Sequence, residues 1–413
     1  MPSPETILLA SAGRLLLEYN DSTNNICRAL QKTAKAISNL DCEAAVTYSG
    51  ITVTLGTEAP LRMPVRELRY NAALQARVHA ILRKLQAGQL DSAAGQKLLY
   101  DVEATTPRHP LWLRVVCLGV AAACLAMLLK ADQGALIAAG ISTGLGLAAR
   151  HELARRHFNL LTLPLVAGFM GAVCGGFAYR MGWTQTPALA LIVPSLMLVP
   201  GPHLINSLLD LVDNHLTMSL ARLWLAAGIL VASALGMALG IGLTLQELPQ
   251  SSSHSASELN LVSDMVLAGL VTLGFALFYN TTWAHAAMAI VGGMIGHGTR
   301  YLMLESGWSL ITATFLGAFA VGLVSSVIVR LYQVPLAVVA FAGAVTMMPG
   351  VQIYRTVSGS LQLANQIGTA DQALVALTLG SAAQACYVVL ALGLGLLTAA
   401  RLSRMIKEQA VLG

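Results

Sequence analysis

Residues 111–129 read LWLRVVCLGVAAACLAMLL, an apolar stretch with one charged residue, Arg114. An α-helix needs about 20 predominantly apolar residues to cross the hydrocarbon core of a bilayer, and this stretch is close to that length. Residues 111–129 therefore predict a transmembrane helix. They decide the fold because the remainder of the chain repeats the same pattern.

Nine further apolar runs follow the first and are separated by polar loops. Two of them, 187–199 and 335–348, are short. The runs predict an α-helical polytopic membrane protein with about ten transmembrane helices, at 111–129, 134–149, 160–179, 187–199, 216–243, 261–278, 283–303, 308–329, 335–348 and 373–400.

The composition agrees with a membrane protein, since 56% of the 413 residues are hydrophobic and only 11% are charged. A soluble globular protein carries about 25% charged residues. Residues 1–109 nevertheless hold 12 Lys or Arg and 10 Asp or Glu, which is nearly half of all the charged residues. We therefore expect residues 1–109 to face water and most of the remaining chain to face lipid.

The first 109 residues predict a small α+β domain. Helical periodicity covers 5–19, 24–40, 70–85 and 91–102, and β-branched residues around Ser49-Gly50 predict a hairpin at 44–55 with a third strand at 61–68. No secretory signal is recognisable, because Arg14 interrupts the one apolar stretch near the N-terminus. The domain is therefore expected in the cytoplasm.

The loop charges predict the orientation. Arg150, Arg155 and Arg156 lie on the same side as the N-terminal domain if every predicted helix crosses, as does the basic end of the chain. The loop at 246–260 has no Lys or Arg and lies on the opposite side, while Arg180 and Arg300 are exceptions. We expect a multi-pass protein of the inner cell membrane with both termini cytoplasmic.

Two related motifs indicate an internal repeat. LVPGPHL occupies 198–204 and MMPGVQI occupies 347–353, and each follows a short apolar run and precedes a polar stretch and one long run. Because each half has about five crossings, the second half must enter the membrane from the opposite side. The predicted organisation is a cytoplasmic domain at 1–109, a polar extracytoplasmic loop at 244–260, and inverted five-helix modules at 110–243 and 261–413.

Each Pro-Gly pair should end its helix and leave unwound backbone, which at membrane depth is tolerated only beside protein or a water-filled cavity. Such breaks bind substrates and ions in transporters with inverted repeats. The helical wheel after the first break puts polar residues on one face, and that after the second gathers amides around Arg355. The candidate transport residues are Pro200, Gly201, His203, Asn206, Asp210, Asp213, Pro349, Gly350, Arg355 and Gln362.

Other interpretations of these residues stay open. Both polar stretches could be interfacial helices in the headgroup layer, although such helices favour Lys and Arg over the carboxylates found after the first break. Four more ionisable residues fall inside predicted helices, where they are costly and often functional. These are Asp264, His285, His297 and Glu305.

Several functional classes are disfavoured. The six cysteines form no CxxC motif, so we expect neither a disulfide framework nor a metal site. The cations form no dense stripe, which argues against nucleic-acid binding. No HExxH motif occurs, and Ser358-Gly359, the candidate serine-protease motif, comes after His285 and His297 with no later histidine, so we expect no enzyme and no cofactor. The absence of a Walker motif favours secondary transport.

The chain resembles the threonine/serine exporter family over nearly its whole length. Besides its order of modules, the matching features are LLASAG at 8–13, the hairpin at 45–55, VREL at 65–68, Pro200-Gly201 with Asn206 and Asp210, and Pro349-Gly350. The two predicted membrane modules are not equivalent, because the second has Leu361 at the position that corresponds to Asp210 in the first.

The resemblance implies export of threonine, serine or another small polar metabolite. Proton-coupled antiport is expected, with Asp210 as the candidate coupling group, because a carboxylate in a low-dielectric site has a raised pKa. The expected partners are the substrate, protons and membrane lipid, and homo-oligomerisation is left open. The alternatives are a dicarboxylate exporter, for example of succinate, and a channel or signalling protein with a regulatory N-terminal domain.

Overall fold

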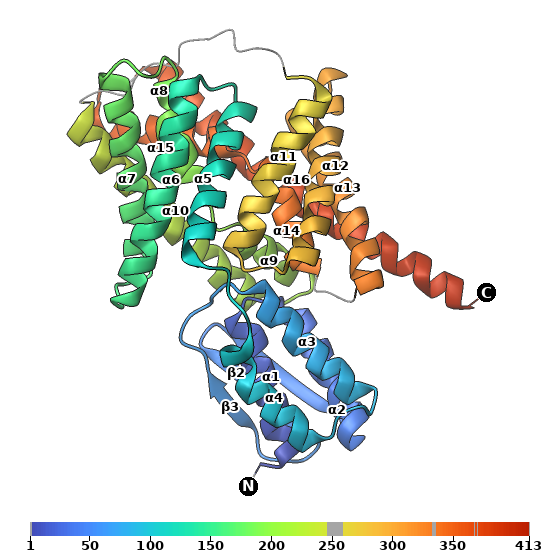
Figure 1. Cartoon of the computed structure of the whole chain (residues 1–413). Coiled ribbons are helices and arrows are strands. Elements are labelled where there is room, and N and C mark those ends of the chain that lie inside the picture. Colours follow the sequence, from blue (N-terminus) through green and yellow to red (C-terminus); the bar gives the residue numbers. More distant parts are fainter. Residues whose placement is uncertain (1, 246–258, 333–335, 367, 370, 413) are drawn as a thin grey trace.

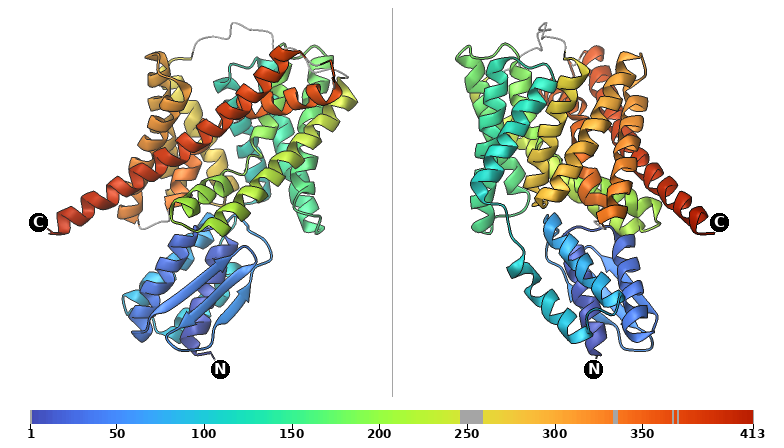
Figure 2. Two further views of the ribbon diagram at one scale, coloured as in Figure 1. Left: turned by 180° about the vertical axis from the view of Figure 1, so that it is seen from behind. Right: turned by 45° about the vertical axis from the view of Figure 1, so that its right-hand side comes forward.

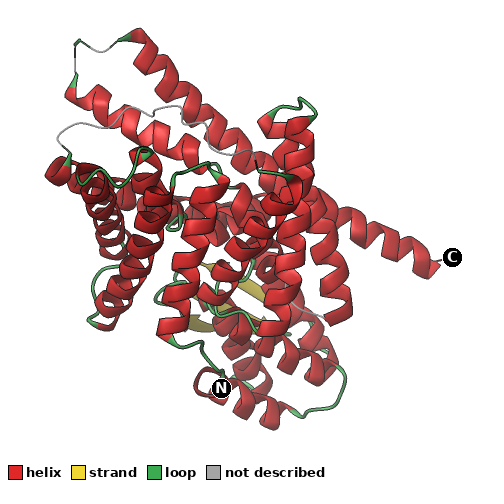
Figure 3. Cartoon of the chain, turned by 45° about the horizontal axis from the view of Figure 1, so that its top comes forward, coloured by secondary structure: helices red, strands yellow, loops and turns green. Residues whose placement is uncertain are grey.

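The computed structural model describes residues 2–245, 259–332, 336–366, 368–369 and 371–412. Most of the predicted polar loop at 244–260 lies outside these residues. A small N-terminal region with three strands lies below a larger assembly of helices (Figure 1). Figure 3 shows that the strands are confined to the N-terminal region of the described chain.

The N-terminal region combines four helices with an antiparallel sheet in the order β1-β2-β3. Its elements are α1 (Pro4–Glu18), α2 (Thr23–Ser38), β1 (Cys42–Thr47), β2 (Gly50–Leu55), β3 (Leu61–Pro64), α3 (Ala72–Gln86) and α4 (Ser92–Thr105). The predicted helices and hairpin are confirmed. The third strand ends at Pro64 rather than at Leu68.

Helices α1 and α2 cover one face of the sheet. Ile51, Val53 and Leu55 alternate along β2 and are buried against the leucines of α1. Gly13 makes this close contact possible, because a Cβ atom there would lie 2.6 Å from Cδ1 of Ile51. The N-terminal region thus has its own apolar core, which Met218 of the larger assembly also contacts.

The rest of the described chain is helical. It contains α5 (Leu111–Leu128), α6 (Gln133–Arg155), α7 (Thr162–Arg180), α8 (Pro187–Leu196), α9 (Gly201–Val212), α10 (Leu216–Thr244), α11 (Leu261–Phe278), α12 (Trp283–Glu305), α13 (Leu310–Tyr332), α14 (Leu336–Ala344), a 3₁₀ turn at Val345–Met347, α15 (Gly350–Asn365) and α16 (Gln372–Leu412). Among the described residues six helices are long and apolar enough to cross a membrane, or seven if the bent pair α8–α9 counts as one span. The protein is therefore a multi-pass helical membrane protein.

The same packing recurs in both halves of the helical assembly. Helix α7 packs against α6, α8 and α10, and α13 packs likewise against α12, α14 and α16. A Cβ atom on Gly236 of α10 would lie 1.9 Å from the carbonyl oxygen of Leu165, and one on Gly395 of α16 would lie 2.5 Å from that of Phe315. Glycine thus admits the same close helix crossing in each half.

Helices α5 and α11 pack together and run in opposite directions. The backbone N–H of His109, just before α5, donates to Oδ1 of Asn280, just after α11, over 2.8 Å. The N–H groups of Ala72 and Ala73 at the start of α3 donate to the carbonyls of Tyr279 and Asn280. The free N–H groups at the start of α3 thus pair with the free carbonyl groups at the end of α11, and these hydrogen bonds hold the N-terminal region against the helices.

Candidate functional site

Two interrupted helices lie at the centre of the helical assembly. Helix α8 ends at Leu196, and α9 begins after Pro200 at an angle of 56° to it. In the other half α14 continues into a 3₁₀ turn, and α15 begins after Pro349. A proline cannot donate the backbone hydrogen bond that would continue a helix, so both breaks occur where the sequence predicts them.

The two breaks contact each other across the halves. A Cβ atom on Gly201 would lie 2.0 Å from Cε2 of Phe341 and 3.0 Å from Cε of Met348. A Cβ atom on Gly350 would lie 2.3 Å from Cδ1 of Leu196. Each glycine therefore makes room for side chains of the opposite break, and the predicted residues Pro200, Gly201, Pro349 and Gly350 converge.

Beyond the first break, α9 lies over the N-terminal region, as the rear view in Figure 2 shows. Nδ2 of Asn206 donates to the carbonyl of Asn20 over 2.7 Å, and the N–H of Thr23 donates to Oδ1 of Asp210 over 2.9 Å. Asn24 Nδ2 donates to Oδ2 of Asp213 over 2.7 Å. The polar face of α9 therefore meets the segment between α1 and α2.

Asp210 forms an ion pair that is closed to solvent. Its Oδ2 lies 3.3 Å from Nε of Arg222 on α10, and both side chains are 0% exposed. Arg222 also donates from Nη2 to the carbonyl of Asp21 over 2.5 Å. The N-terminal region thus supplies a backbone acceptor to a buried guanidinium of the membrane part.

Asp21 extends this network within the N-terminal region. Its Oδ2 lies 2.6 Å from Nε2 of His79 on α3, and its Oδ1 accepts from the N–H of Ser22 and from Asn25. Burial alone would raise the pKa of Asp21, but these hydrogen bonds and the charge of His79 favour the carboxylate, and its pKa is lowered. The carboxylate therefore stays ionised at neutral pH.

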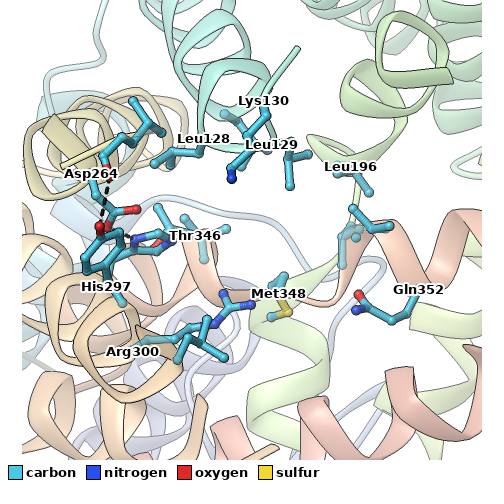
Figure 4. A pocket seen from close by; sticks show the side chains of 18 of the residues that line it. Leu128, Leu129, Lys130, Leu196, Asp264, His297, Arg300, Thr346, Met348 and Gln352 are labelled. Carbon is cyan, nitrogen blue, oxygen red and sulfur yellow. Dashed lines mark hydrogen bonds and ion pairs between the residues drawn. The ribbon is translucent and has the colours of Figure 1, made fainter. Parts of the chain in front are cut away.

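A cavity of about 540 Å³ is lined by the end of α5, the start of α11 and the end of α12, together with residues of both breaks. These helix ends lie on the side of the assembly away from the N-terminal region (Figure 1). Figure 4 shows Asp264, His297 and Arg300 on one of its walls. His297 Nδ1 lies 2.5 Å from Oδ1 of Asp264, while Nε of Arg300 is buried and has no hydrogen-bond partner among the described residues. The other polar lining residues include Lys130, Tyr301, Glu305, Thr346, Gln352 and Arg355.

The structure does not bring all the candidate transport residues together. Arg355 lines the large cavity with Gly350, whereas Asp210 meets Arg222 and the N-terminal region. Gln362 is not among the residues that line this cavity, and Asp213 lies 3.6 Å from Arg401 of α16. The polar face of α9 therefore meets the N-terminal region, whereas Gln352 and Arg355 of α15 line the large cavity.

His203 is buried at the start of α9, where its ring lies 5.2 Å from that of Tyr70. Sequence reasoning did not single out Tyr70, Asp21, His79 or Arg222 as site residues. Arg222 did leave a signal, since it is a charge inside the apolar run at 216–243. Arg150 and Arg300 are a second signal in the sequence, because they occupy the same position in α6 and α12, which are equivalent helices of the two halves.

Comparisons with known proteins identify the chain's relatives. The sequence profile of the threonine/serine exporters (ThrE) matches residues 7–245, and a second threonine/serine exporter profile matches residues 264–400. The chain is 24% identical to the "Threonine/serine exporter" of Corynebacterium glutamicum over 392 residues, which are 91% of this chain and 80% of the relative.

A second relative is the "Probable succinate transporter subunit YjjP" of Escherichia coli (strain K12). It is 21% identical over 240 residues, which are 57% of this chain and 93% of that protein. No solved structure matches the chain. The profile matches span both halves of the helical assembly, and they confirm the expected family and the expectation of a transporter rather than an enzyme. The chain belongs to the threonine/serine exporter family.

Proposed function

We propose that the protein exports threonine and serine through a path that passes between the two Pro-Gly breaks. The observation that carries this proposal is the contact of the breaks, with a buried polar network on one side and a large polar cavity on the other. Unwound backbone between two aqueous compartments is the arrangement by which many secondary transporters hold their substrates.

The topology of this path follows from an inverted repeat of ten crossings, in which α8–α9 and α14–α15 are broken spans. The shared packing of the two halves and the opposite directions of α5 and α11 support it. We assign residues 1–109 to a cytoplasmic domain, residues 110–243 and 261–413 to the two membrane modules, and residues 244–260 to an extracytoplasmic loop. Both termini are then cytoplasmic, and the large cavity opens to the outside.

The large cavity, named the outer cavity from here on, fits a zwitterionic amino acid. Its volume is in the range of small-molecule sites, which is about 300–1,000 Å³. The unpartnered Nε of Arg300 offers a donor to a carboxylate, and Asp264 offers an acceptor to an ammonium group. Thr346 and Gln352 lie within the same lining and offer polar groups to a side-chain hydroxyl.

Proton antiport would act through Asp210. When Asp210 is ionised, it holds α9 against Arg222 of α10 and against Thr23. Protonation removes the charge that attracts the guanidinium, so the contact weakens and α9 can separate from the N-terminal region. A proton would then be exchanged for a substrate molecule at each opening of the inner side.

A dicarboxylate is the second candidate substrate, because the outer cavity has more cations than carboxylates. Lys130, Arg300 and Arg355 line it together with Asp264 and Glu305. Similarity to a relative named as a succinate transporter subunit adds to this possibility.

Efflux of labelled threonine, serine and succinate from proteoliposomes that contain the purified full chain tests the proposal. We expect threonine and serine to leave at comparable rates, several-fold faster than succinate and faster still when the outside is acidic. Efflux of succinate alone would establish the second candidate and overturn the first.

A further inference from the structure

A second, smaller cavity lies between the N-terminal region and α9. Its volume is about 50 Å³, which is room for a few water molecules but not for an amino acid. The N-terminal region contributes more than half of its lining, and α9, α11 and α14 with their adjoining residues contribute the rest. The lining residues are Tyr19, Asn20, Tyr70, Asn71, Ala72, Gln75, Pro202, Ile205, Asn206, Tyr279 and Phe341.

Unpartnered polar atoms are concentrated around this cavity. Five buried atoms have no hydrogen-bond partner within the part of the chain that the structure describes: Nδ2 and Oδ1 of Asn20, Nε2 of Gln75, Oδ1 of Asn206 and the hydroxyl of Tyr70. Asn20 and Gln75 are each 4% exposed, and Asn206 is 1% exposed. An unsatisfied buried polar group costs about 1–3 kcal/mol, so five such atoms around one cavity indicate a site that is completed by a ligand.

Other polar groups that line this cavity already have hydrogen-bond partners. The hydroxyl of Tyr19 donates to Glu103 over 2.8 Å, and Oδ1 of Asn71 accepts from the N–H of Leu74 and from Asn280. These groups line the same cavity but are already paired. The fully buried donors and acceptors without a partner among the described residues belong to the amides of Asn20, Gln75 and Asn206 and to the hydroxyl of Tyr70.

The described residues that line the cavity include no Asp, Glu, Lys, Arg or His. Amide donors and acceptors can pair with the carboxylate, the ammonium group and the hydroxyl of a hydroxy amino acid, whose net charge is zero. A dicarboxylate would enter with two negative charges and no cation in the lining to pair with them, and an unpaired buried charge is strongly unfavourable. The chemistry of this lining therefore differs from that of the charged outer cavity.

We propose that this cavity is the inner substrate site of the exporter, and that Asn20 and Gln75 of the N-terminal region, with Asn206 of α9, select net-neutral hydroxy amino acids over dicarboxylates. The proposal rests on the proposed function. It gives the N-terminal region a direct part in transport, because two of the three selecting amides belong to it. The site widens when α9 and the N-terminal region separate, and it is closed in this structure.

The test measures efflux of labelled threonine from proteoliposomes of known protein orientation, at a series of internal concentrations. Gln75→Leu and Asn206→Leu each remove an amide from the cavity. Each should raise the half-saturating internal concentration of threonine about tenfold, the equivalent of ~1.4 kcal/mol. The half-saturating concentration for uptake from the outer side should not change.

Gln96→Leu is the matched control, because Oε1 of Gln96 is also buried and unpartnered but Gln96 does not line the cavity. It should leave the internal half-saturation unchanged. Gln75→Lys introduces a cation and should raise the ratio of succinate to threonine efflux several-fold. If Gln75→Leu lowers the yield of folded protein, Gln75→Asn withdraws the amide by one methylene and should give a smaller shift of the same kind.

The outcomes separate this inference from the proposed function. If the parent protein exports threonine but the cavity variants match it in internal half-saturation and in substrate ratio, the inner site is refuted and the proposed function stands. If the parent does not export threonine or serine, the proposed function itself fails.

Discussion

Replacing Asp210 by Asn leaves the guanidinium of Arg222 buried without its ion-pair partner. The two side chains are 3.3 Å apart and 0% exposed. Removal of one partner from a buried ion pair typically costs about 3–5 kcal/mol, much of it from the charge left behind. Asn can still accept the hydrogen bond from the N–H of Thr23, so the loss comes from the charge rather than from that bond.

The same helix provides a control. Asp213 lies 3.6 Å from Arg401, but their side chains are 26% and 58% exposed. An exposed pair of this kind contributes about 0–1 kcal/mol. Asp213→Asn should therefore change stability little, although it removes the same chemical group from the same helix.

The assay is thermal unfolding of the purified full chain in detergent. At about 2 °C per kcal/mol, Asp210→Asn should lower the apparent Tm by roughly 6–10 °C, and Asp213→Asn by about 2 °C or less. The double variant Asp210→Asn with Arg222→Gln should recover at least half of the loss, because no unpaired charge remains. Asp210→Glu should retain some proton-dependent efflux, whereas Asp210→Asn should have none.

Equal melting temperatures for Asp210→Asn and Asp213→Asn would refute the buried pair. Proton-dependent efflux by Asp210→Asn that matches the parent would refute Asp210 as the coupling group.

The remaining predictions concern the network, the breaks and the topology. His79→Leu removes a hydrogen bond that helps lower the pKa of Asp21. In the parent, ionised Asp21 stabilises the fold above its unfolded pKa of about 3.9, and this stabilisation is lost as the pH falls through the lower folded pKa. The variant should therefore begin to lose Tm at a higher pH than the parent, when Tm is measured against pH. Gly350→Ala puts a methyl 2.3 Å from a leucine methyl of the other break, and it should reduce efflux at least tenfold while Gly380→Ala, with open space around it, does not. A cysteine at Ser306 in a cysteine-free background should react with an impermeant maleimide from outside intact cells, and labelling only after permeabilisation would contradict the proposed orientation.

Much of the fold follows from local pattern. Helix α11 has the bounds that hydropathy predicts, 261–278, and the hairpin β1–β2 turns where Ser49-Gly50 indicates. The differences have local causes. β3 stops at Pro64 because Pro64 pairs with Gly50, the first residue of β2, so its partner strand ends there. Helix α6 continues to Arg155 because a helix can extend past the apolar run into water.

The contacts of the site could not be predicted in the same way. A helical wheel shows that one face of α9 is polar, but not what that face meets. The segment around Asp21 has no periodic pattern that could reveal its insertion against α9 and α10. Proline and glycine mark both breaks because they act on their own backbone, whereas the pairing of Arg222 with Asp210 depends on the packing of the whole chain.

The most direct test of the transport path is substrate protection of a cysteine in the outer cavity. In a cysteine-free background, Thr346→Cys places a thiol in the cavity beside the second break, and Ser306→Cys places one outside its lining. We predict that saturating threonine slows alkylation of the cysteine at Thr346 several-fold, leaves the cysteine at Ser306 unaffected, and protects more strongly than succinate. Alkylation of the cavity cysteine at the same rate with and without threonine, in protein that transports threonine, would contradict a path through this cavity.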